Sequence, residues 1–167
     1  AKAEHLKDEG DLLVAIAQNN LPAVVFYKPV GEENEHPGYT DVMTGDSHVA
    51  ALINKIRQSP MWQDTAIIVT YDENGGFWDH VPPSKGDRWG PGSRAPTIII
   101  SPFAKRGFVD HAQCDTTSVL RLIERRYGLA PLGERDARAN DRQNAFDFTS
   151  KAGMHHPAMP KRKQKAS

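Results

Sequence analysis

The stretch from Thr65 to His80, TAIIVTYDENGGFWDH, places an apolar run directly before a group of polar residues. The run from Ala66 to Tyr71 is rich in β-branched residues, which is typical of a buried strand in a parallel sheet. Such sheets bind ligands at the carboxyl ends of their strands, where Asp72 and Glu73 lie. Because adjacent carboxylates repel each other, a divalent metal ion held by their oxygens is one interpretation. A solvated acidic turn closed by glycines is the other.

Two further apolar segments, Ala23 to Tyr27 and Pro96 to Ser101, predict strands on either side of this one. We expect all three to be parallel members of one sheet, joined by right-handed crossovers. The chain beyond Leu132 is polar and predicts irregular structure. Helical spacing of apolar residues, together with capping and stop signals, predicts three helices, over 5–18, 46–58 and 116–127.

Parallel strands would bring the loops that follow them to one edge of the sheet, here called the rim. The first of these loops carries His36, the second carries Asp72, Glu73, Asp79 and His80, and the third carries His111. Acids and histidines that converge in this way are what a hydrolytic metal site requires. His48 and His111 are interpreted as structural residues. His80, which Asp79 could orient, is open to two interpretations: a contact with metal or substrate, or a structural hydrogen bond.

Composition excludes several classes of function. The 167 residues include 21 basic and 21 acidic side chains, so no net field attracts nucleic acid or membranes. No apolar run approaches the roughly 20 residues that span a bilayer, and no signal-peptide pattern opens the chain. Cys114 is the single cysteine, which excludes an internal disulfide. We therefore expect neither a nucleic-acid partner nor stable membrane insertion, and we expect residues 149–167 to be a disordered basic tail.

Five short motifs follow one another along the chain: EHPGY at 35–39, YDENGGFWDHV at 71–81, GDRWGPG at 86–92, SPFA at 101–104 and DTTS at 115–118. In this order and spacing they resemble the bacterial phosphoesterase family, which contains phosphatidylcholine-type phospholipases C and a class of secreted acid phosphatases. The resemblance covers residues 1–148 and is strongest to the acid-phosphatase branch.

The resemblance implies an alkaline-phosphatase-like α/β fold, with a parallel sheet and flanking helices. Members hydrolyse phosphoric esters through a phospho-enzyme on Ser or Thr that a divalent metal ion activates. Metal ligands of the family correspond to Asp72 and Glu73, although many relatives have a second Asp where this chain has Glu. The family's phosphate-contacting histidine corresponds to His36, which could also protonate the leaving oxygen. We predict His80 as a further substrate contact.

The same resemblance places a Glu-Asn pair of metal ligands and the nucleophile in an N-terminal half that this sequence does not contain. The chain therefore resembles the C-terminal portion of such an enzyme, and the missing N-terminal half is its expected partner. The predicted activity is acid-phosphatase-type hydrolysis of phosphate esters, with this chain alone incomplete and inactive. Phospholipase C activity on phosphatidylcholine is an alternative, and an inactive binding piece is another. Family resemblance implies a periplasmic or secreted location.

Overall fold

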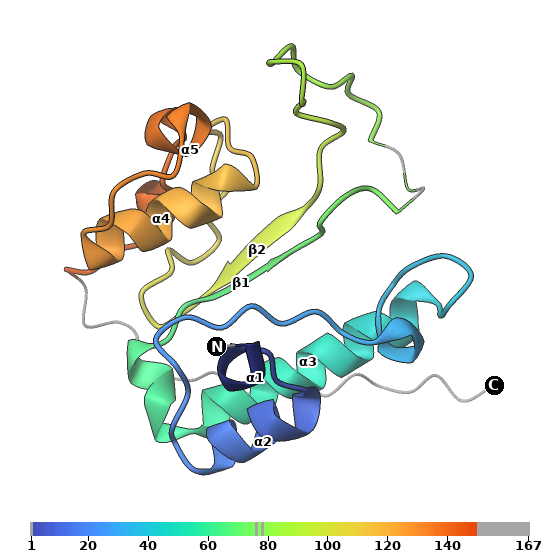
Figure 1. The fold of residues 1–167 in the computed structure, drawn as a ribbon, viewed down its shortest axis with the longest axis vertical. Coiled ribbons are helices and arrows are strands. Elements are labelled where there is room, and N and C mark those ends of the chain that lie inside the picture. The colour runs from blue at the N-terminus through green and yellow to red at the C-terminus, as the bar shows by residue number, and fades with distance from the viewer. Residues whose placement is uncertain (1, 76, 78, 150–167) are drawn as a thin grey trace.

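The computed structural model describes residues 2–75, 77 and 79–149. Residues 150–167 of the predicted tail lie outside the described residues, as do Gly76 and Trp78 of the second motif. In the view of Figure 1 a small sheet lies between a group of helices formed by α1 to α3 and a second group formed by α4 and α5. In chain order the elements are α1 Lys2–His5, α2 Glu9–Ala17, η1 Gly31–Glu33, α3 Val42–Gln58, η2 Pro60–Asp64, β1 Ile67–Thr70, β2 Thr97–Ile100, α4 Thr117–Tyr127, α5 Glu134–Arg138 and η3 Gln143–Ala145.

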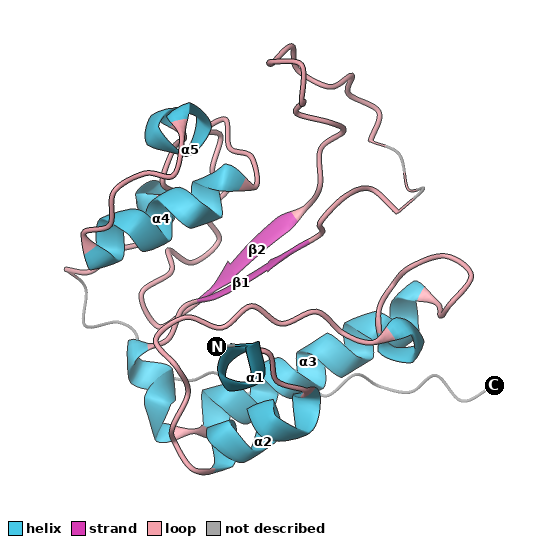
Figure 2. Ribbon diagram, viewed as in Figure 1, coloured by secondary structure: helices cyan, strands magenta, loops and turns pink. Residues whose placement is uncertain are grey.

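The described sheet has two strands, and they are antiparallel. Ile67 pairs with Ile100 and Thr70 with Thr97, and the hydroxyl oxygens of Thr70 and Thr97 lie 3.0 Å apart. The prediction that these strands run parallel is therefore wrong. A continuous apolar run indicates burial and not direction, and the long connection 71–96 contains no crossover helix among its described residues (Figure 2). The carboxyl end of β1 consequently adjoins the amino end of β2, so the two arms of this loop form the rim.

The segment Ala23 to Tyr27 was predicted as the first strand, and the structure shows it as loop. Its contacts are made by individual groups and not by a strand ladder: the Tyr127 hydroxyl donates to the carbonyl of Ala23 at 3.1 Å, and the Tyr27 hydroxyl donates to Glu9 at 3.0 Å. Strand propensity reflects how well side chains fit a pleated, half-buried surface. Phe26 is 79% exposed, so that surface is missing at this segment of the described chain.

Helices α2 and α3 each begin with an aspartate cap. The Asp8 side chain accepts from the Asp11 backbone N–H at 2.9 Å before α2, and the Asp41 side chain accepts from the Thr44 backbone N–H at 2.8 Å before α3. Helix α3 thus begins at Val42, before the predicted start at residue 46. The reason is that the Asp41 side chain already accepts a hydrogen bond from a free backbone N–H group of the first turn. Helix α5 was not predicted at all. No helix among the described residues has the length and apolar character needed to cross a lipid bilayer.

Gly45 allows the chain preceding α3 to pack closely against that helix. A Cβ at this position would lie 2.5 Å from Cγ of Glu35 and 2.7 Å from the carbonyl oxygen of Asn34. Any larger side chain would push the 34–35 segment away from the helix, and His36 comes directly after this segment. The absence of a side chain at Gly45 therefore helps to position the loop that carries His36.

The buried apolar side chains are few and come from both halves of the described chain. Residues 145–147 pack beside 103–105, where the Lys105 backbone N–H donates to the carbonyl of Ala145 at 2.9 Å and the Asp147 backbone N–H donates to the carbonyl of Phe103 at 2.8 Å. The late segment is thus part of the folded unit and not a solvated extension. The buried apolar residues are Ile16, Leu52, Trp62, Ala145 and Phe146.

Candidate functional site

Two segments far apart in the sequence, 28–37 and 71–75, lie beside each other at the end of β1. Two contacts join the segments: Lys28 Nζ lies 2.7 Å from Asp72 Oδ2, and the Tyr71 hydroxyl donates to Glu35. Burial raises the pKa of Tyr71 to about 12, so its hydroxyl stays protonated at neutral pH. Gly75 also lies near Pro37, since a Cβ built on Gly75 would be 3.7 Å from Cδ of Pro37. The His36 loop and the carboxylates that follow β1 therefore belong to one region of the surface.

Asp72 is a solvent-exposed carboxylate held in its charged form. The hydrogen bond from the Lys28 ammonium, followed by the charge of that group, lowers the pKa of Asp72 below its usual value. The Glu73 backbone N–H donates to the other Asp72 oxygen at 3.1 Å. Asp72 therefore offers an anionic, accessible oxygen beside a place already occupied by a positive charge. The cation that compensates Asp72 in this structure is Lys28.

Glu73 accepts a hydrogen bond from the Gly75 backbone N–H at 2.8 Å. Gly75 has a φ of 58°, a left-handed conformation that glycine adopts without strain. The structure therefore contains the acidic turn that was one interpretation of the sequence. This turn does not exclude a metal ion, because the bond from Gly75 uses one oxygen of the Glu73 carboxylate and leaves the other. In the part of the chain that the structure describes, no group of three close ligand atoms contains Asp72 or Glu73. The two carboxylates would supply only part of a metal's coordination.

His36 lies on the exposed loop, and its ring is held by local contacts. Its Nδ1 lies 2.7 Å from the carbonyl oxygen of Pro37, and its backbone N–H donates to the Asn34 side chain at 2.8 Å. Because a carbonyl can only accept, Nδ1 carries the proton in this contact and Nε2 is the nitrogen left for chemistry. The ring also meets the edge of Tyr39, with 5.2 Å between ring centroids. These contacts restrain the His36 ring without burying it.

His80 lies further along the loop, and its side chain is 91% exposed. Its Nδ1 is 3.5 Å from Asp79, a distance too long for a strong hydrogen bond. Asp79 is instead engaged by Arg94, with oxygen–nitrogen distances of 2.6 and 3.0 Å, and by the Val81 backbone N–H at 2.8 Å. Asp79 therefore joins the two arms of the 71–96 loop more than it orients His80.

An open hollow of about 480 Å³ lies beside the Asp79–Arg94 pair. The side chain of Arg94 is 60% exposed, so the ion pair leaves it accessible to solvent. Sequence reasoning did not select Arg94 as a site residue, since its partner lies 15 positions earlier and no local pattern indicates the pairing. The hollow is lined by Phe77, Asp79, Arg94, Ala95 and Pro96.

We expect the Asp79–Arg94 pair to make stability depend on acid pH. Hydrogen bonding from Arg94 lowers the pKa of Asp79 to about 2, whereas an unfolded Asp titrates near about 3.9. The stabilisation is therefore fully present above about pH 4 and is lost as pH falls through 2. Asp79→Asn should lower the free energy of unfolding at pH 7, and this difference should shrink toward zero near pH 2. Urea unfolding at several pH values measures it.

The control for this experiment is Asp64→Asn, which neutralises an exposed aspartate at the end of η2. Its effect should stay small at every pH. A destabilisation by Asp79→Asn that remained constant between pH 7 and pH 2 would contradict the ion-pair explanation.

His111 follows β2 and was expected on the shared edge. Because β2 runs antiparallel to β1, its carboxyl end adjoins the amino end of β1 and not the rim. The reason for placing His111 with Asp72 therefore disappears.

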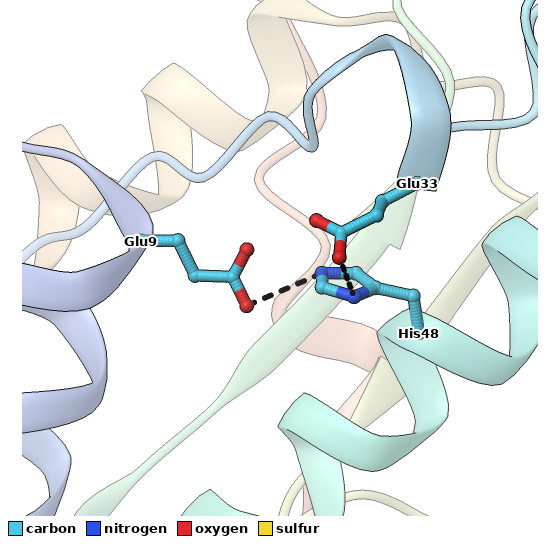
Figure 3. A group of neighbouring side chains, drawn as sticks. All are labelled: Glu9, Glu33 and His48. Carbon is cyan, nitrogen blue, oxygen red and sulfur yellow. Dashed lines mark ion pairs between the residues drawn. The ribbon is translucent and has the colours of Figure 1, made fainter.

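A second polar group, which we call the His48 cluster, consists of Glu9, Glu33 and His48 (Figure 3). One potential ligand atom from each residue lies within 4.8 Å of the other two, and no other such trio occurs among the described residues. His48 was interpreted as a structural residue near a helix start, but α3 begins at Val42, so His48 lies inside the helix. The three residues come from α2, η1 and α3, and no local sequence pattern indicates that they meet.

Comparison with known proteins identifies the family. Residues 3–130 match the profile of the Phosphoesterase family. The chain belongs to this family. This membership agrees with the motifs in the sequence.

Several relatives of this phosphoesterase chain are phospholipases C by name. Phospholipase C A of Mycobacterium tuberculosis is 32% identical over 188 aligned positions, which cover 91% of this chain and 36% of the relative. Non-hemolytic phospholipase C of Pseudomonas aeruginosa is 29% identical, with 87% and 26% covered. Non-specific phospholipase C1 of Arabidopsis thaliana is 32% identical, with 68% and 26% covered. The chain thus spans about a third or less of the length of these relatives.

Proposed function

We propose that this chain supplies the C-terminal part of a site that hydrolyses phosphoric esters, of the acid-phosphatase type, on an alkaline-phosphatase-like fold. The observation that carries the proposal is the contact between the 28–37 and 71–75 segments at the end of β1. This contact gathers the acidic pair and the His36 loop on one surface of a chain that belongs to the phosphoesterase family.

Asp72 and Glu73 are the metal ligands in this proposal. Their carboxylate oxygens suit a hard divalent cation, which would take the place beside Asp72 that the ammonium of Lys28 holds at 2.7 Å. A bound metal ion would supply neutralisation of phosphoryl charge and a lowered pKa for the attacking group. The remaining ligands would come from a part of the enzyme outside this chain.

His36 is the catalytic residue that we assign to this chain. With Nδ1 donating to the Pro37 carbonyl, Nε2 is available to hydrogen-bond a phosphoryl oxygen or to give a proton to the leaving oxygen. His80 is exposed on the same loop system as Asp72 and is assigned a substrate contact. Both side chains are exposed to solvent and therefore accessible to a substrate.

The nucleophile of the phospho-enzyme has no counterpart in this chain, and we place it in an N-terminal half of the same enzyme. This agrees with the 26–36% of the relatives' lengths that the chain covers. The family resemblance supports a periplasmic or secreted location for the whole enzyme.

Phospholipase C activity is the second candidate, and the names of the relatives favour it. A substrate panel on a full-length protein that carries this segment separates the two. Hydrolysis of soluble aryl phosphomonoesters with no release of phosphocholine from phosphatidylcholine supports the acid-phosphatase type, and the reverse supports phospholipase C.

We expect the 167-residue chain alone to show no turnover, because a phospho-enzyme mechanism requires an attacking residue that this proposal places elsewhere. The measurement is release of nitrophenol from p-nitrophenyl phosphate in the presence of Mg²⁺, Mn²⁺, Ca²⁺ or Zn²⁺. A preparation of Asp72→Asn, purified in parallel, controls for contaminating phosphatases. Turnover that exceeds this control would show that the chain contains its own nucleophile.

A further inference from the structure

The His48 cluster is partly withdrawn from water and contains two negative charges. The exposed fractions of the side chains are 15% for His48, 29% for Glu9 and 39% for Glu33. Among the described side chains, neither carboxylate has a lysine or arginine nitrogen within 4.0 Å, and His48 is the only basic group that pairs with them. With a neutral imidazole, the cluster would hold two uncompensated carboxylates, which repel each other. A cation placed between the carboxylates would relieve this repulsion.

Hydrogen bonds assign one ring nitrogen of His48 and leave the other facing a carboxylate. The Tyr27 hydroxyl lies 2.7 Å from Nε2 of His48 and donates to Oε2 of Glu9 at 3.0 Å. The hydroxyl oxygen is then an acceptor for Nε2–H. In the neutral ring, the lone pair of Nδ1 points toward the Glu33 side chain.

The spacing between Nδ1 and Glu33 suits two ligands of one metal ion. Nδ1 lies 3.5 Å from Oε1 of Glu33, which is longer than a good hydrogen bond of about 2.7–3.2 Å. Zinc bonds to nitrogen and oxygen of about 2.1 Å in a tetrahedral arrangement put neighbouring ligand atoms about 3.4 Å apart. Glu9 offers a third donor: one carboxylate oxygen lies within 4.8 Å of the other ligand atoms of the trio, and its printed contact with the ring is to Nε2, at 3.6 Å, so it would turn toward Nδ1 to bind the same ion. Imidazole with carboxylates is a donor set that Zn²⁺ accepts.

We propose that Glu9, Glu33 and His48 bind a divalent transition-metal ion, for which Zn²⁺ is the probe. Nδ1 of His48 and the carboxylates of Glu33 and Glu9 are the ligands. The Tyr27 hydroxyl oxygen accepts a hydrogen bond from Nε2–H and orients the ring, as carboxylates, backbone carbonyls and waters do behind many metal-bound histidines. This site is separate from the one assigned to Asp72 and Glu73 and does not depend on that assignment.

Such a metal ion would tie three elements together behind the rim. Tyr27 and Glu33 face the cluster, while their neighbours Lys28 and Glu35 contact Asp72 and Tyr71. One ion at His48 would therefore hold the loop that leads to His36 against α2 and α3. Its role is structural, since none of its ligands belongs to the proposed catalytic residues.

The test is isothermal titration of Zn²⁺ into the full 167-residue chain after treatment with EDTA. We expect one bound ion per chain and a rise of Tm in thermal unfolding, because a ligand that binds only the folded state stabilises it. His48→Gln and Glu33→Gln should each weaken Zn²⁺ binding by at least about tenfold. Glu33 is the most exposed of the three, so its variant retains the fold if His48→Gln does not.

Two control variants address other histidines. His111→Gln and the double variant His155→Gln/His156→Gln should both retain the bound ion. Absence of one-to-one binding, or binding that His48→Gln and Glu33→Gln leave unchanged, would overturn the proposal. Binding that is lost in Asp72→Asn but kept in His48→Gln would also overturn it, while supporting the separate metal assignment at the rim.

Discussion

Replacing Asp72 with Asn in a full-length phosphoesterase that carries this segment should lower turnover by at least about 100-fold. The change removes one negative ligand from the proposed metal pair while preserving the size of the side chain. Turnover on p-nitrophenyl phosphate and affinity for the activating metal ion should fall together. Titration of the metal-free enzyme with the metal, followed by activity, measures both.

The fold should survive this substitution. Asp72 is exposed, and its ion pair with Lys28 is exposed on both sides, so solvent and salt already weaken it. We expect Tm to fall by no more than about 4 °C. Asp87→Asn is the matched control: it also removes an aspartate of the 71–96 loop that pairs with a cation, here Arg135, but Asp87 is not one of the proposed site residues. Equal losses of turnover in the two variants would contradict a specific role for Asp72.

Replacing His36 with Ala should lower turnover by about 10²–10⁴-fold while leaving metal affinity unchanged. The structure supports the separation, because the His36 ring is held by Pro37 and Tyr39 and not by Asp72 or Glu73. If His36 donates a proton to the leaving oxygen, the loss should be smaller for phosphate esters whose leaving group needs no proton. Comparison of p-nitrophenyl phosphate with an alkyl phosphate measures this difference.

His5→Ala provides the control for His36→Ala, since His5 is an exposed histidine outside the proposed site. It should change neither turnover nor metal affinity. A loss of metal affinity in His36→Ala as large as that in Asp72→Asn would show that His36 is a ligand. Unchanged turnover would remove it from the catalytic assignment.

Two of the three predicted strands are present, and the reason lies in their composition. Ala66 to Tyr71 and Pro96 to Ser101 are apolar, β-branched runs bounded by polar loops, and they contain β1 and β2. The run at Ala23 to Tyr27 has a similar composition but no strand of the described chain pairs with it. Composition measures the tendency to become a strand, whereas pairing depends on which segment arrives beside it.

Strand direction was the main error. Residues 71–96 are rich in Gly and Pro, which exclude a regular element but do not say whether the chain crosses over or turns back. Antiparallel pairing places both arms of that loop at the end of β1 and leaves His111 without a reason to join them. The rim therefore exists, but it is built from one long loop and the 28–37 segment.

Local sequence by itself determined the family, the two described strands and the acidic pair that follows β1, since each is written in consecutive residues. Only the tertiary structure decided which distant groups meet. Lys28 beside Asp72, Arg94 on Asp79 and the trio around His48 join residues that are 44, 15 and up to 39 positions apart. Side-chain identity limits what a group can bind, but contacts of this kind depend on how the packed elements turn the chain back on itself, and no local pattern encodes that path.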